Sequence, residues 1–115
     1  MNDCIFCKII KKEIPADIVY ETEDIICFRD IRPVAPIHVL VIPKKHIEKL
    51  TDLKPEDDAI LVQIYKAINE VAKLEGVSEK GFRVIANCGE DGGQVVGHLH
   101  FHVLGGKILG PKLVN

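Results

Sequence analysis

The sequence predicts an α+β domain in which one long helix packs on a largely antiparallel sheet. Residues 55–75 have helical periodicity, whereas the other apolar runs are short and rich in β-branched residues. The links between these runs are too short for parallel crossovers, which favours antiparallel pairing. A length of 115 residues suits a single domain over 1–115, because two independent cores would each be too small.

The first part of the chain is expected to hold a short helix and then strands. Residues 3–11 read as a short helix or turn that ends before Pro15. Apolar, β-branched runs separated by turn residues predict three strands. These are Ile18–Glu21, Ile25–Asp30 and His38–Ile42, the last stopped by Pro43.

The long helix is expected from Pro55 to about Glu75. Its apolar residues recur at helical spacing and form one face. Pro55 fits the first helical position, acidic residues follow where the helix dipole favours them, and Gly76 is a natural stop. Two strands then complete the domain, at 82–87 and 98–104, with a glycine-rich loop between them.

The composition excludes several classes of function. The formal net charge is −2, so nothing suggests a broad nucleic-acid-binding face, and a nucleotide would be bound in a pocket. No run approaches the roughly 20 apolar residues of a membrane span, and the N-terminus lacks a signal pattern. We therefore expect a cytoplasmic protein with no membrane or nucleic-acid partner, whose cysteines are thiols or metal ligands.

The histidine-rich strand is the strongest functional signal. Three of the five histidines, His98, His100 and His102, fall within five positions. Alternation along a strand places them on one face and leaves Leu99, Phe101 and Val103 for the core.

Three interpretations of these histidines compete. A solvated polar face would more often carry mixed lysine, glutamate and threonine. A single metal site is disfavoured, since His98 and His102 would lie roughly 13 Å apart at Cα, whereas a Zn–N bond is about 2.0–2.1 Å. The third interpretation is phosphoryl chemistry, because a neutral imidazole can attack phosphorus while a neighbouring one donates a proton. The loop Gly92–Val96 supports it, since glycine lets main-chain N–H groups approach an anion, as at Gly93.

With these residues in view, the chain resembles the histidine triad family. Gly97–Leu104 matches its His-φ-His-φ-His-φ-φ signature, where φ is apolar. The resemblance covers nearly the whole chain and extends to the Hint branch, nucleoside phosphoramidases that bind purine nucleotides. The further matching segments are Ile5–Ile10, Glu13–Pro15, Phe28–Ile31, Ala35–His46, Asn87 and Asp91–Gln94.

The resemblance implies a role for each matching residue. His100 resembles the nucleophile that attacks the α-phosphorus of an adenosine phosphoramidate and forms a nucleotidyl-histidine. His102 resembles the phosphate-side donor, and His38 the additional histidine that supports the other two. Asp30 matches the carboxylate that binds the ribose hydroxyls. The base clamp would be Phe6, Ile9, Phe28 and Ile31, and the phosphate and ribose contacts Asn87, Gln94 and the main chain at Val95.

The resemblance also bears on assembly and on substrate. It implies a five-stranded sheet that joins a second copy as a ten-stranded sheet, with AMP-like purine nucleotides as ligands. Val95 stands where the branch usually has a hydroxyl residue, so its side chain cannot bond phosphate. A nucleotide-binding regulatory module and a dinucleoside polyphosphate hydrolase are the alternatives.

Cys4 and Cys7 form a pair with metal-ligand spacing. Zinc, redox use and two buried thiols are the alternatives, and no thioredoxin-like context surrounds the pair. The candidate partners are His46 and His98, which would complete a four-coordinate structural zinc site. Zinc-containing members of the family use a similar arrangement, in which the first histidine of the strand is a ligand.

Overall fold

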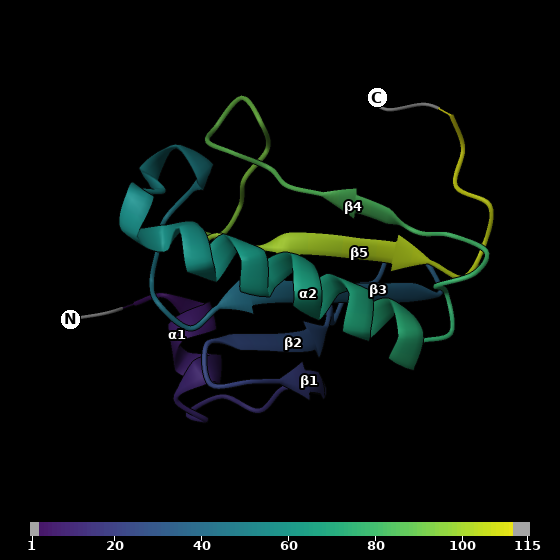
Figure 1. Ribbon diagram of the computed structural model, residues 1–115, viewed down its shortest axis with the longest axis horizontal. Coiled ribbons are helices and arrows are strands. Elements are labelled where there is room, and N and C mark those ends of the chain that lie inside the picture. The colour runs from purple at the N-terminus through teal and green to yellow at the C-terminus, as the bar shows by residue number, and fades with distance from the viewer. Residues whose placement is uncertain (1–2, 112–115) are drawn as a thin grey trace.

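The structure is a computed structural model that describes residues 3–111. Within that range, five strands form one sheet in the order β1-β2-β3-β5-β4, and every neighbouring pair is antiparallel (Figure 1). The predicted α+β class and antiparallel sheet are confirmed. The elements are α1 Ile5–Ile10, β1 Ile18–Glu21, β2 Ile25–Arg29, β3 Ile37–Pro43, 3₁₀ turns at Leu50–Asp52 and Pro55–Asp57, α2 Asp58–Leu74, β4 Arg83–Ile85 and β5 Phe101–Gly105.

The long helix begins with a tighter turn than the sequence predicts. Residues 55–57 form a 3₁₀ turn, and the α-helical part starts at Asp58. The Asp57 carboxylate accepts from the N–H of Lys54 at 3.0 Å and from Lys45 Nζ at 2.6 Å, which ties this turn to the loop after β3. In residues 3–111, no helix is long and apolar enough to cross a membrane.

The last strand is shorter than predicted, because it begins at Phe101 and not at His98. β3 pairs with β5 with Val41 opposite Phe101, so the same register would set Leu99 opposite Pro43. Proline has no N–H to donate to a ladder. The N–H of Leu99 donates instead to the carbonyl oxygen of Ile47 at 2.6 Å. His98 and His100 therefore lie on an irregular segment that precedes β5, and only His102 lies within the strand.

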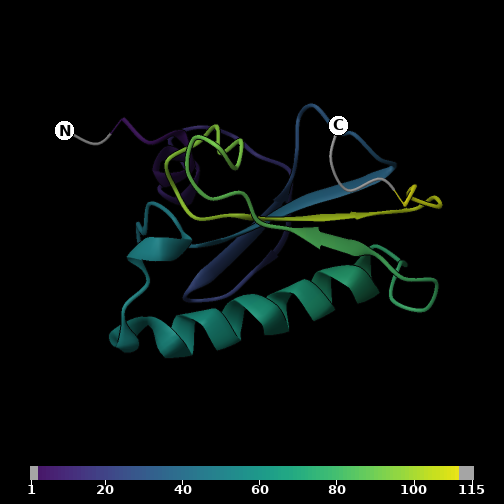
Figure 2. The same ribbon diagram turned by 90° about the horizontal axis from the view of Figure 1, so that it is seen from above.

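The two faces of the sheet pack against different helices (Figure 2). Odd-numbered residues of β2 and β3, such as Cys27 and Val41, pack with α2 in the larger core. Even-numbered ones, such as Phe28 and Leu40, pack on α1. The predicted placement of Leu99, Phe101 and Val103 in the core is confirmed, since all three belong to the α2-side cluster. This leaves the α1 side of β3 and β5 for the polar site.

Candidate active site and metal centre

The histidines fall into two groups at the α1 side of the sheet. Within residues 3–111, one group joins His98 and His46 to two cysteines, and the other joins His38 and His102 to Asp30. His100 lies between them, with its ring centroid 5.1 Å from that of His102. The three histidines predicted on one strand thus divide between two kinds of site.

His38 and His102 meet because of the β3–β5 register. His102 lies opposite Leu40 and His38 opposite Leu104, so the two histidines are diagonal neighbours on one face. Their Nε2 and Nδ1 atoms are 2.9 Å apart. Asp30, just beyond β2, places Oδ2 3.5 Å from His38 Nε2. Strand pairing alone therefore assembles this polar group.

The main chain sets the tautomer of this pair. The N–H of Val34 donates to Nδ1 of His38 at 3.2 Å, so a neutral His38 carries its proton on Nε2. That Nε2–H donates to Nδ1 of His102, which places the proton of a neutral His102 on Nε2. The Val34–His38–His102 chain thus presents His102 as a donor at Nε2.

His100 has the opposite tautomer. Its Nδ1 lies 2.7 Å from the carbonyl oxygen of His98, which can only accept, so Nδ1 carries the proton. The ring is 6% exposed, and its edge meets the ring of Phe6 at a centroid distance of 5.2 Å. Nε2 of neutral His100 consequently holds an unprotonated lone pair, which is the requirement for a nucleophile.

Burial keeps the two histidines of the second group, His38 and His102, neutral. It lowers the pKa of His102 from 6.5 to about 4, assisted by the neighbouring His100 and His38. Burial also lowers the pKa of His38, although the Asp30 carboxylate opposes this shift. Both rings are therefore uncharged near neutral pH, as the tautomer chain requires.

The Cys4–Cys7–His46–His98 group has the dimensions of a tetrahedral metal site. Nδ1 of His98 lies 3.4 Å from Cys4 Sγ and 3.1 Å from Nδ1 of His46, and Cys7 Sγ lies 3.2 Å from His46 Nδ1. Bond lengths of about 2.0–2.1 Å for Zn–N and 2.3 Å for Zn–S in a tetrahedron give ligand separations of about 3.3 to 3.8 Å. The observed distances come close to that range.

The protonation of His98 also suits a ligand. Its Nε2 lies 2.8 Å from the carbonyl oxygen of Pro43 and must donate, so Nδ1 holds the lone pair that faces the cysteines. Burial lowers the pKa of His98 to about 4, which keeps that lone pair unprotonated. The Asp30–His38–His102 group lacks this property, because Nε2 of His38 carries the proton.

The glycine loop closes on itself. The N–H of Gly93 donates to Glu90 and that of Gln94 to Gly89, each at 3.0 Å, and Asn87 Nδ2 donates to the carbonyl oxygen of Gly92 at 2.6 Å. A Cβ at position 92 would lie 2.5 Å from the carbonyl oxygen of Cys88, so only glycine fits there. The N–H of Gly93 is thus used inside the loop and does not face an anion in this conformation.

The residues expected around a base are only partly together. Phe6, Ile9 and Phe28 are buried in one cluster, with the two phenyl rings 5.5 Å apart. Ile31 is 92% exposed and lies outside that cluster. Val95 is 93% exposed. Both exposed side chains are apolar and are in contact with solvent.

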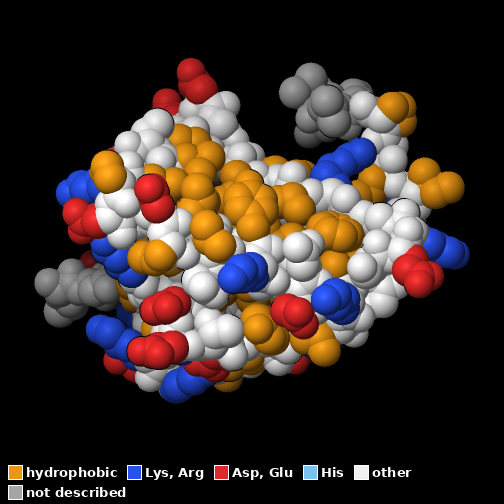
Figure 3. Space-filling model, viewed as in Figure 1, with side chains coloured by type: hydrophobic (Ala, Val, Ile, Leu, Met, Phe, Trp, Pro, Cys, Tyr) orange, Lys and Arg blue, Asp and Glu red, His pale blue; other side chains and the backbone are white. Residues whose placement is uncertain are grey.

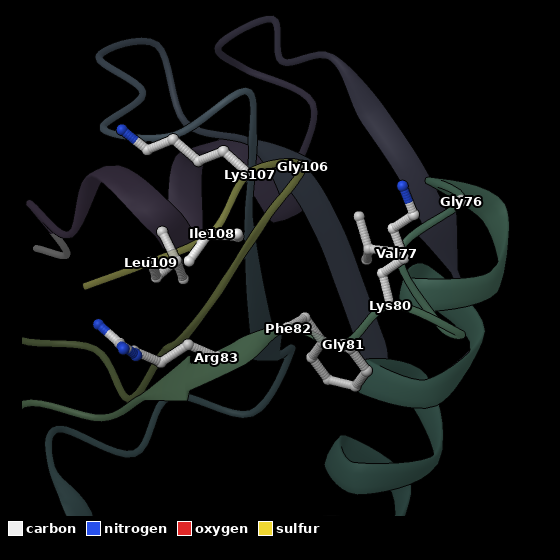
Figure 4. A pocket seen from close by; sticks show the side chains of 10 residues that line it. All are labelled: Gly76, Val77, Lys80, Gly81, Phe82, Arg83, Gly106, Lys107, Ile108 and Leu109. Carbon is white, nitrogen blue, oxygen red and sulfur yellow. The ribbon is translucent and has the colours of Figure 1, made fainter. Parts of the chain in front are cut away.

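A hollow lies beyond the C-terminal end of β5, and none of the predicted site residues lines it (Figure 4). Its volume is about 670 Å³, and its lining is apolar with three cationic side chains. These cationic side chains are Lys80, Arg83 and Lys107. Nothing in its lining offers a nucleophile of the kind found at His100.

The contacts that sequence reasoning missed are main-chain ones. The Val34 N–H and the carbonyl groups of Pro43, Ile47 and His98 orient the histidine segment. A motif reports side chains and carries no signal for such groups. Pro43 is the one residue of this set whose type carries a signal in the sequence. A proline at the end of a strand indicates that the strand cannot donate a main-chain hydrogen bond at that position.

Comparison with known proteins identifies relatives along almost the whole chain. The family described as "Scavenger mRNA decapping enzyme C-term binding" matches residues 3–113. Protein HitA of Neisseria gonorrhoeae is 47% identical over 105 residues, which cover 91% of this chain and 97% of that protein. The purine nucleoside phosphoramidase of Escherichia coli K12 is 43% identical over 114 residues, covering 99% and 96%.

Solved structures give the same picture. A HIT family hydrolase from Clostridium thermocellum superimposes with a TM-score of 0.96 at 50% identity and covers 99% of each chain. A HIT family hydrolase from Legionella pneumophila superimposes with a TM-score of 0.92 at 46% identity, covering 95% of this chain and 97% of that one. The similarity therefore extends over the sheet, both helices and the histidine segment.

The low pKa of His102 predicts a measurable acid sensitivity. Nuclear magnetic resonance titration of its ring should give a midpoint near 4, with the proton on Nε2 at neutral pH. Because this pKa lies below that of an exposed histidine, protonation favours the unfolded chain. The contribution to the unfolding free energy is complete above pH 6.5 and is lost as the pH falls toward 4. A midpoint near 6.5, or a proton on Nδ1, would contradict the Val34–His38–His102 chain.

Proposed function

The chain belongs to the histidine triad family of hydrolases, and on that premise we propose that it cleaves purine nucleoside phosphoramidates through a nucleotidyl-His100 intermediate. The observation that carries the proposal is the pairing of opposite tautomers. Because Nδ1 of His100 bonds a carbonyl oxygen, Nε2 is the ring nitrogen available as the nucleophile, and the adjacent neutral His102 is a donor. A phosphoramidase among the relatives supports the same substrate class.

The proposed reaction has two displacements. In the first, His100 Nε2 attacks the α-phosphorus, the P–N bond to the amine breaks, and the amine takes a proton from a water molecule, which leaves a hydroxide ion. In the second, that hydroxide attacks the same phosphorus, the bond to Nε2 breaks, and AMP leaves with His100 again neutral. The carbonyl group of His98 stabilises the charge that develops on the His100 ring, because it accepts from Nδ1–H throughout.

His102 is best suited to binding a phosphate oxygen. A neutral imidazole is a weak acid, and burial holds the pKa of its protonated form at about 4. Donation from Nε2 to an equatorial oxygen stabilises the transition state without proton loss. This role agrees with the phosphate-side donor that the family resemblance implies for His102, and it is better suited to a neutral imidazole than protonation of the leaving amine. His38 then acts as the support that holds His102 in the donor tautomer.

Both alternative functions make different demands on the site. A regulatory nucleotide-binding module needs no nucleophile, yet His100 is buried with its lone pair set by a main-chain bond. A dinucleoside polyphosphate hydrolase would share the nucleophile and differ in its leaving group. The preferred leaving group therefore distinguishes phosphoramidate cleavage from dinucleoside polyphosphate hydrolysis.

The substitution His100→Ala tests the nucleophile. Release of AMP from adenosine 5′-phosphoramidate should fall by about 10³-fold or more, since the covalent route is lost. AMP affinity, measured by calorimetry, should stay within a few-fold of that of the unaltered protein. The unaltered protein should release AMP faster from the phosphoramidate than from a diadenosine polyphosphate. Unchanged turnover in His100→Ala would refute the mechanism, and preference for the polyphosphate would refute the substrate class.

We also propose that the Cys4–Cys7–His46–His98 group binds one structural zinc ion. The support is the donor set, the ligand separations and the lone pair on His98 Nδ1. Zinc bound there would join α1 to the segment that carries His100, because Cys4 caps the N-terminus of α1, Cys7 lies within α1 and His98 belongs to that segment. Its role is to hold the two together.

Zinc content is measured directly by inductively coupled plasma mass spectrometry. The purified protein should contain close to one zinc per chain, and the double substitution Cys4→Ser, Cys7→Ser should lose it, because two of four ligands are gone. Cys88→Ser is the matched control, since Cys88 lies outside the group and should leave the zinc content unchanged. Equal zinc in the double variant and the control would show that the ion is held elsewhere.

A second copy of the chain is the proposed partner. β4 is at the edge of the sheet, and exposed apolar side chains lie on the same molecular face, where Figure 3 shows them gathered over and beside α2. Val62 and Tyr65 on α2 are 53% and 52% exposed, and Val84 on β4 is 37% exposed. Pairing of two β4 edges would extend the sheet to ten strands and cover this apolar surface.

Light scattering coupled to size-exclusion chromatography should report twice the chain mass. The double substitution Val62→Lys, Tyr65→Lys should yield the monomer mass, because two cations would meet their copies across the interface. Leu74→Lys, at the C-terminal end of α2, is the control and should remain dimeric. A monomeric unaltered protein would exclude the proposed dimer.

A further inference from the structure

Gln94 lies in the glycine loop, but its side chain is bonded to main-chain groups. Among the described residues, its Oε1 accepts from the N–H of Gly89 at 2.9 Å. Its Nε2 donates to the carbonyl oxygens of Glu48 at 2.8 Å and Val96 at 2.9 Å. A carboxamide has two N–H protons, and both are used. The side chain therefore has no donor left for a phosphate oxygen in this conformation.

The bond to Glu48 connects the loop to residues 46–48, which also contact two other parts of the site. His46 belongs to the cysteine–histidine group, and the carbonyl oxygen of Ile47 accepts from the N–H of Leu99, next to His100. The third residue, Glu48, receives the Gln94 amide. Three successive residues therefore make three different contacts. His46 belongs to the cysteine–histidine group, Ile47 bonds the segment that carries His100, and Glu48 bonds the glycine loop.

We propose that Gln94 is a positioning residue that fixes the glycine loop, residues 89–96, against residues 46–48 and so places the loop beside His100 for the transition state. The inference rests on the proposed function, because it takes this loop as the binder of the reacting phosphate. It replaces the direct phosphate contact expected for Gln94 with an indirect role. The main-chain N–H groups from Val95 onward would then meet the phosphate.

The loop needs a bond to another element because its glycines make its conformation costly to order. Gly89 and Gly93 have positive φ values of 73° and 76°, and glycine loses more conformational entropy on ordering than any other residue. The Asn87–Gly92 bond closes the loop internally but does not attach it to another element. Gln94 supplies that attachment across 46 positions of sequence. Donors fixed before the reaction need no reorganisation when charge develops.

The substitution Gln94→Met keeps the length of the side chain and removes all three bonds. Hydrogen exchange of the free protein should be faster by about tenfold across residues 89–96, with exchange in α2 unchanged. With adenosine 5′-phosphoramidate, kcat should fall by about 10–100-fold while KM changes by less than about threefold, because misplaced donors act chiefly on the transition state. Lys49→Met is the matched control, since Lys49 is a half-buried neighbour of Glu48 whose Nζ pairs, within residues 3–111, with the side chains of Glu48 and Asp52 and with no residue of the loop.

Gln94→Glu provides a second variant that keeps the acceptor for Gly89 and loses both donors. Gln94→Glu should also give faster exchange across residues 89–96 and a lower kcat. If Gln94→Met does not fold, this variant tests the positioning role of Gln94. Unchanged loop exchange, an unchanged kcat, or a raised KM at constant kcat would each overturn the proposal, the last because it indicates a direct substrate contact. If the unaltered protein does not cleave the phosphoramidate, the proposed function fails, whereas the exchange comparison still tests the attachment of the loop.

Discussion

The register between β3 and β5 is the constraint on which the rest of the site depends. With Leu40 opposite His102, His38 and His102 become diagonal neighbours within hydrogen-bond reach. The same register brings Pro43 to the point where the ladder would continue, and the chain leaves the sheet there. This departure lets His98 turn toward the cysteines of α1 and lets its carbonyl group hold His100. A shift of one residue would exchange the two faces of β5 and destroy both groups.

The main chain then decides what each histidine can do. Val34 donates to His38, whereas Pro43 and His98 offer carbonyl oxygens to His98 and His100. Because a neutral imidazole has one proton, each contact assigns the opposite nitrogen as donor or lone pair. Burial lowers the pKa of His98 and His102 to about 4 and so protects this assignment near neutral pH. One short segment consequently contains the proposed metal ligand His98, the proposed nucleophile His100 and the proposed donor His102.

Much of this follows from the sequence, and the remainder has an identifiable physical reason. β1 was predicted with its observed bounds, because Ile18–Glu21 is a β-branched run flanked by turn residues. The start of β5 was predicted three residues too early, because the alternation of 98–104 carries no information about Pro43 on another strand. The spacing of Cys4 and Cys7 predicted a metal-ligand pair, His46 and His98 were the candidate partners as histidines not needed for catalysis, and the structure brings these four together. The roles of Asn87 and Gln94 depend on loop closure, which no local pattern reveals. Residence in the cytoplasm and a single domain over the whole chain stay predictions from the sequence.

The central claim is that Nε2 of His100 becomes covalently bonded to the nucleotide. Rapid quenching of the protein after mixing with adenosine 5′-phosphoramidate, followed by mass spectrometry of the intact chain and its peptides, measures this directly. A transient mass increase of one adenylyl group is expected on the peptide that contains His100, and none in His100→Ala. An adduct on another residue, or full turnover with no adduct at any quench time, would contradict it.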